Sequence, residues 1–153
     1  MAAYSQTTNF LVSIKRVMEI WNNTTDEIMV AQIMDLIDTE FAAMETAGLA
    51  GYTVTTGLEA SMLQKLNNMS NDTKRLAMQK FLEYLLAEFA LVQTNGLSYT
   101  VTDDSFAAAT GAYGAVSGMK HSMYCWPNQT HRTGFDQIIT ILSTELDALE
   151  TAS

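Results

Sequence analysis

The sequence predicts a mainly α-helical protein, a single-domain bundle of about five to six helices with a minor two-stranded β element. Apolar residues recur every three or four positions over most of the 153-residue chain, which is typical of helices that bury one face. Several expected helix starts carry Thr followed three residues later by Glu or Asp. The tetrapeptide YTVT occurs twice, at 52–55 and 99–102. Since 48% of the residues are apolar and one is proline, we expect residues 1–153 to form one domain around a sizeable core.

Two helices are expected in the first 48 residues. An apolar stripe at helical spacing covers residues 10–21. Thr24 and Glu27 have the spacing of a capping box, in which each side chain satisfies a free amide of the first turn, so the second helix should begin there. It should stop at Gly48, because glycine accepts the left-handed conformation common just past a helix end. We interpret its polar strip as a solvated face rather than a catalytic or metal-binding one: Gln32, Asp35, Asp38, Thr39 and Glu45.

Two more helices are expected in the middle of the chain. Thr56 with Glu59 repeats the capping-box spacing ahead of a short apolar stripe, which predicts a short third helix. After the polar break NNMSND, a long fourth helix is predicted from Thr73 to about Val92. The pair Asn95-Gly96 should end it.

Each copy of YTVT follows a helix that ends in glycine. In an extended chain Tyr52 and Val54 point to one face and the threonines to the other, and the same holds for Tyr99 and Val101. We therefore predict two short strands, which pair with each other or are continued by strands of neighbouring chains. The alternative is two unrelated connectors that both favour Thr and Val.

The stretch DDSFAAATGAYGAVSGMK is rich in small residues, among them Gly111, Gly114 and Gly118. Glycine weakens a helix by about 1 kcal/mol relative to alanine, so its presence needs a compensating contact. Close packing against another helix is the interpretation we favour. A loop ordered by a partner is the alternative, and membrane insertion is disfavoured because the stretch is short and internal.

Both histidines and the single cysteine lie within residues 121–136, at His121, Cys125 and His131. Thiolate and imidazole ligands suit zinc, and a thiol enzyme could use Cys125 as nucleophile, His131 as base and Asp136 to orient it. A zinc site normally shows paired ligands such as C-x2-C, which this chain lacks. We therefore predict no catalytic residue, no metal and no cofactor. We interpret the stretch as a structural turn with two aromatic anchors, Tyr124 and Trp126.

The last helix is expected to begin near Thr133, which has Asp136 at the capping-box spacing. Its apolar stripe should be buried against the domain or a second chain. We interpret its acidic residues as a solvated outer face: Glu145, Asp147 and Glu150.

The net charge of −9 argues against binding to nucleic acid or to an anionic membrane, both of which need clustered positive charge. A single cysteine cannot form an intrachain disulfide, and the N-terminal residues show no secretory leader. No run reaches the roughly 18 apolar residues of a membrane span. We therefore expect synthesis in the cytoplasm and no secretion.

These features predict a structural or assembly protein that contacts copies of itself or other proteins, and not an enzyme. Small Asn-, Thr- and Met-rich helical proteins of this kind are common in phage particles, so a virus particle is the kind of complex we consider first. The alternative function is a metal-binding module or thiol enzyme centred on residues 121–136. The residues predicted to form the interface are Tyr52, Val54, Tyr99, Val101, Gly111, Gly114 and Gly118.

Overall fold

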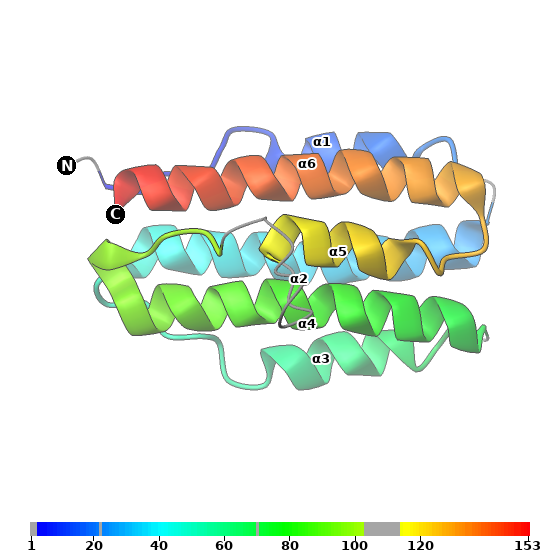
Figure 1. The fold of residues 1–153 in the computed structure, drawn as a ribbon, viewed down its shortest axis with the longest axis horizontal. Coiled ribbons are helices and arrows are strands. Elements are labelled where there is room, and N and C mark those ends of the chain that lie inside the picture. The colour runs from blue at the N-terminus through cyan, green and yellow to red at the C-terminus, as the bar shows by residue number, and fades with distance from the viewer. Residues whose placement is uncertain (1–2, 22, 70, 103–113) are drawn as a thin grey trace, which may run out of the picture.

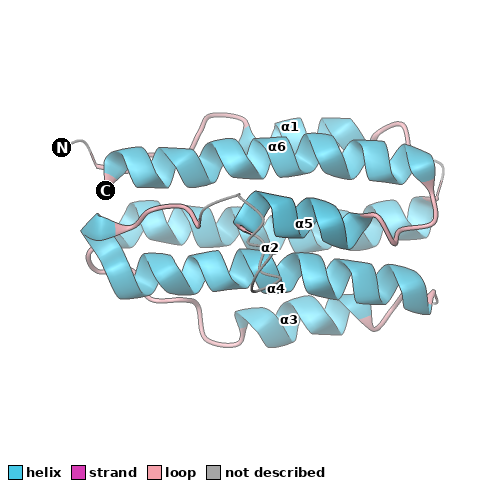
Figure 2. Cartoon of the chain, in the orientation of Figure 1, coloured by secondary structure: helices cyan, strands magenta, loops and turns pink. Residues whose placement is uncertain are grey.

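The computed structural model describes residues 3–21, 23–69, 71–102 and 114–153. These residues fold into a bundle of α-helices (Figures 1 and 2). Its elements are α1 (Phe10–Met18), α2 (Thr24–Ala47), α3 (Leu58–Leu66), α4 (Asp72–Asn95), the short 3-10 helix η1 (Gly96–Ser98), α5 (Ala115–Met123) and α6 (Gln129–Ala152). The predicted helical bundle is thus confirmed.

The α-helices alternate between two lengths. The helices α1, α3 and α5 have 9 residues each, and α2, α4 and α6 have 24 residues each. The three long helices run in the same direction and the short ones run opposite to them (Figure 1). Each short helix packs between two long ones: α1 between α6 and α2, α3 between α2 and α4, and α5 between α4 and α6. The helices therefore form a ring around a common core.

This alternation reflects three copies of one unit, each made of an extended segment, a short helix and a long helix. Equivalent residues of the long helices are 48 positions apart between the first and second units and 57 between the second and third, as in Glu40, Glu88 and Glu145. In the third unit the linker between the extended segment and the short helix, residues 103–114, is ten residues longer than in the other two units. Such a repeat forms a stable core only when its copies pack on one another.

All three long helices start with the same cap. The side-chain oxygen of an asparagine accepts a hydrogen bond from the backbone N–H three residues later, at 3.0–3.1 Å. The capping residues are Asn23, Asn71 and Asn128. The predicted capping boxes were therefore misplaced: Asn23 caps α2 in place of Thr24, and α6 begins one turn before Thr133.

The predicted helix ends at glycine are confirmed. Gly48 and Gly96 follow α2 and α4 with φ of 76° and 53°, and their backbone N–H groups donate to carbonyls of the last turn. Gly57, with φ of 80°, stands before α3, where Thr56 with Glu59 was expected to form a cap. That helix starts without a side-chain cap.

The predicted two-stranded β element is not found in the described residues. No strand occurs in the described parts of the chain, and both YTVT copies are extended segments without a ladder partner. Their alternation of Tyr and Val with Thr is real, but each segment lies between two long helices and bonds to helix side chains instead of to another segment.

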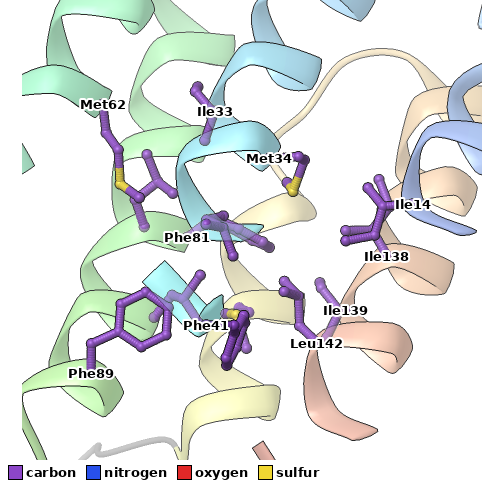
Figure 3. Close-up of a cluster of buried hydrophobic side chains, with 14 of the residues drawn as sticks. Ile14, Ile33, Met34, Phe41, Met62, Phe81, Phe89, Ile138, Ile139 and Leu142 are labelled. Atoms are coloured by element: carbon purple, nitrogen blue, oxygen red, sulfur yellow. The ribbon is translucent and has the colours of Figure 1, made fainter. Parts of the chain in front are cut away.

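The core is continuous through all three units. Apolar side chains from facing turns of the long helices fill the centre, and Figure 3 shows Phe41, Phe81, Phe89 and Ile138 among them. The ring of Phe41 meets that of Phe89 edge-on at 5.3 Å between centroids, a favourable aromatic geometry. The helices are thus held by side-chain packing around the axis of the bundle.

Candidate functional site

Each extended segment carries the pattern Tyr-x-x-Thr and places its tyrosine inside the bundle. The first copy, YSQT at 4–7, was missed by the sequence analysis because it shares only its outer residues with YTVT. Each tyrosine hydroxyl donates a hydrogen bond to a buried glutamate of a long helix. The pairs are Tyr4 with Glu145, Tyr52 with Glu40, and Tyr99 with Glu88.

The threonine of each segment completes the contact, because its backbone N–H donates to the same glutamate at 3.0–3.2 Å. The donors are Thr7, Thr55 and Thr102. The residue before each threonine donates its backbone N–H to a neighbouring long helix. These acceptors are Glu45, Gln93 and Glu150. Each segment therefore ties two long helices together, and Glu145 belongs to this interior network rather than to the solvated face expected for it.

These contacts raise the pKa of all three tyrosines well above the ordinary value. Burial is the largest cause, and the hydrogen bond to the glutamate and its negative charge act in the same direction. The tyrosines therefore stay protonated as donors in the folded protein, and deprotonation would break the contact.

At the opposite end of the bundle, the three units place different side chains at one equivalent position, three residues after each capping asparagine. These residues are Asp26, Lys74 and His131, and they meet near the axis. Lys74 forms an ion pair with Asp26, and its ammonium lies 5.5 Å from the ring centre of Trp126. We call these three residues the mixed polar layer.

The imidazole of His131 is fully buried in this layer. Its Nδ1 accepts a hydrogen bond from Trp126 Nε1 at 3.0 Å and lies 3.8 Å from a carboxylate oxygen of Asp26. The ring of Trp21 stacks on it at 4.3 Å between centroids. Burial, followed by the positive charge of Lys74, lowers the pKa of His131 and outweighs the opposite effect of Asp26. The histidine is therefore a neutral, structural residue.

The residues proposed for the alternative function, a metal-binding module or thiol enzyme, lie in separate parts of the structure. His131 lies in the core, whereas His121 and Cys125 line a surface groove between α4 and α5. In the described ranges, no three His, Cys, Asp or Glu side chains are grouped so that they could hold a metal ion. Trp126 is buried as an anchor of the turn, as predicted, but Tyr124 is 71% exposed and does not reach the core.

The groove between α4 and α5 has a volume of about 630 Å³ and mostly apolar walls. It is lined along α4 by Leu76, Lys80 and Tyr84 and on the α5 side by His121 and Cys125. His131 makes its hydrogen bond and ring contacts in the core, so the described residues of the groove do not include the Cys125–His131–Asp136 arrangement.

Two glycines allow bulky rings to pack on helix backbone. A Cβ at Gly118 would lie 2.3 Å from the ring of Tyr84, and one at Gly134 would lie 2.5 Å from Nε1 of Trp21. Real side chains do not tolerate such distances, so both positions need glycine. The close helix packing predicted for the glycine-rich stretch is therefore found at Gly118, and its partner is α4 of the same chain.

The residues predicted as an interface lie mostly inside the bundle. Tyr52 and Tyr99 are buried in the glutamate contacts, and Val54 and Val101 are partly buried against the core. Of the glycines, Gly118 is buried, Gly114 is the residue before α5, and Gly111 lies outside the described residues. Their role in an interface stays a prediction, and their side chains contribute little to the surface.

The end where the long helices stop has a shallow pocket of about 300 Å³. Residues of all three units line it, because Tyr4, Leu49, Leu97 and Ala152 come from the start, the two connectors and the end of the chain. Leu97 is half-exposed there, and Glu45 stands at the edge.

The end where the long helices begin has exposed apolar residues at two of its turns. Ile20, between α1 and α2, is 72% exposed, and Tyr124, between α5 and α6, is 71% exposed. They are the most exposed of the large apolar side chains in the described residues. Ile20 directly precedes the buried Trp21, and Tyr124 stands two residues before the buried Trp126; the backbone N–H of each tryptophan bonds to a carbonyl of the preceding helix.

None of the helices in the described ranges combines the length and the apolar composition that crossing a bilayer requires. Comparison of the chain with protein-family models, with curated proteins and with solved structures gave no match.

Proposed function

We propose that this chain is a structural protein that works by assembling with copies of itself or with other proteins. The observation that supports this most is where the polar and apolar groups of the chain lie. The buried glutamates, tyrosines and histidine are engaged in contacts between the three units. The described surface also offers apolar features to other molecules: the exposed turn residues, the groove and the end pocket.

The ring of three tied units also suits a structural role. Each extended segment bonds to two long helices, so separating any two units breaks hydrogen bonds to a buried carboxylate. Such a bundle resists deformation and can serve as a rigid spacer or connector. A virus particle is the assembly in which we place it, on the basis of its composition.

The particle mass of the purified protein, measured by light scattering and native mass spectrometry over a wide concentration range, tests the self-assembly form of this proposal. Species heavier than the 16.9 kDa chain that grow with concentration are the expected result. A protein that stays monomeric throughout would contradict self-assembly and leave only an assembly with other proteins.

A further inference from the structure

The positive charges of this protein are confined to one half of the bundle. The half where the long helices end comprises residues 36–47, 84–95 and 141–152 with the extended segments and connectors 3–9, 48–57 and 96–102, and we call it the acidic half. It contains no Lys or Arg, and all eight of these residues lie in the other half. The acidic half contains seven carboxylates: Asp38, Glu40, Glu45, Glu88, Glu145, Asp147 and Glu150. The rest of the described chain has eight carboxylates for the eight basic residues and is neutral.

The helix dipoles add to this difference. Because α2, α4 and α6 are parallel, all three of their C-terminal ends lie at the acidic end and all three N-terminal ends at the neutral end (Figure 1). A helix carries roughly half a negative charge at its C-terminus and half a positive charge at its N-terminus. The short helices run the opposite way, so their negative C-terminal ends lie at the neutral end and offset the positive N-terminal ends of the long helices there. Their N-terminal ends stop short of the acidic end, so the negative charge of the long-helix C-termini is not offset at that end. The acidic end is therefore negative, whereas the neutral end carries little net charge.

Both ends of the bundle also have exposed apolar features, which project at one end and form a pocket at the other. The neutral end projects two exposed side chains, Ile20 and Tyr124, and the acidic end has the pocket that contains the half-exposed Leu97. Contact between two acidic ends would bring negatively charged surfaces together without a basic residue on either side, which is unfavourable. Contact of an acidic end with a neutral end meets no such repulsion and buries apolar surface on both sides.

We propose that copies of this protein stack end to end, with the Ile20 and Tyr124 turns of one copy against the Leu97 pocket of the next. This inference rests on the proposed function and specifies its interface. The contact is heterologous, since the two copies use different surfaces, and it does not close on itself when successive copies share an axis. The resulting assembly is a linear stack whose length increases with concentration.

Two variants, each with one end blocked, test this directly. Leu97→Glu blocks the pocket end, and Ile20→Glu combined with Tyr124→Glu blocks the turn end; all three positions are exposed, so folding should be retained. Circular dichroism confirms that each variant is folded. Val12→Glu is the matched control, because Val12 has the same 51% exposure as Leu97 but lies on α1 at the side of the bundle.

Analytical ultracentrifugation of the two blocked variants, alone and mixed in equal amounts, distinguishes the outcomes. We expect each to be monomeric alone and the mixture to form a 1:1 dimer that does not grow, because only one functional pair of ends remains. The control should stack as the wild type does. If the wild type assembles and the mixture stays monomeric, or if one variant dimerises alone, this interface is wrong while self-assembly stands. If the wild type never assembles, self-assembly and this interface are both refuted.

Discussion

Replacing Tyr52 with Phe removes one hydroxyl group from the interior and leaves the ring in place. Its acceptor, Glu40, is 1% exposed and then retains a single described donor, the backbone N–H of Thr55 at 3.0 Å. Hydrogen bonds to charged groups contribute about 1.5–3 kcal/mol, and a buried carboxylate left short of donors falls at the upper end. We expect Tyr52→Phe to lower the free energy of unfolding by about 3 kcal/mol.

The equivalent change in the third unit should cost less. Glu88 loses the hydroxyl of Tyr99 but keeps two donors from Thr102, its backbone N–H at 3.2 Å and its side-chain hydroxyl. We therefore expect Tyr99→Phe to lower the free energy of unfolding by about 1.5 kcal/mol. The two variants compare the same contact within one chain, so errors common to both cancel.

Urea unfolding followed by circular dichroism measures both values, with Tyr124→Phe as the control. Tyr124 is 71% exposed, so its change should stay within about 0.5 kcal/mol. In thermal unfolding a loss of 3 kcal/mol corresponds to roughly 6–12 °C for a chain of this size. The reasoning is refuted if Tyr52→Phe behaves like the control, or if Tyr99→Phe is the more damaging of the two.

Three further outcomes are expected. Gly118→Ala should lower the free energy of unfolding by about 1–3 kcal/mol, because the new methyl group collides with the ring of Tyr84. Ser61→Ala, at the equivalent position of α3, is the control and should have little effect in the same urea experiment. The three buried tyrosines have raised pKa values, so above pH 10 they ionise in the unfolded chain but not in the folded one, and the free energy of unfolding should fall by up to about 4 kcal/mol per pH unit. Alkaline unfolding without this steep loss would show that the tyrosines ionise within the folded protein. His131 has a lowered pKa, so its contribution to the free energy of unfolding is complete above the unfolded value of 6.5 and should be lost at lower pH by up to about 1.4 kcal/mol per unit. The stability of the protein and that of a His131→Gln variant, which keeps an acceptor for Trp126, should therefore converge in acid.

The sequence was sufficient to predict the helices but not the structure of the connectors between them. Gly48 and Gly96 end α2 and α4 as predicted, because the positive φ that both adopt is readily accessible only to glycine. The YTVT segments have strand-like composition, yet an extended segment needs a partner to become a strand. Here that partner is a set of helix side chains, Glu40 and Gln93 for the second unit, which local sequence does not specify.

The polar part of the interior was missed for a different reason. Glu145 was interpreted as a surface residue, since isolated acids on a helix are usually solvated. The signal that could have identified the buried glutamates was the repeat, because Glu40 and Glu88 are 48 residues apart, as are Asn23 and Asn71. The third extended segment follows the second after 47 residues, and the linker behind it is ten residues longer, so the long helix of the third unit stands at a spacing of 57, which a search at one period does not find.

The mixed polar layer shows what is gained by having three units in one chain. If three identical copies of a single unit assembled around the axis, this position would hold three aspartates, three lysines or three histidines. Like charges at such distances in a buried site repel strongly, and no ion pair could form. Only when covalently joined copies diverge can one position hold an acid, a base and a neutral imidazole together. The covalent linkage therefore ensures that the layer holds one residue of each kind.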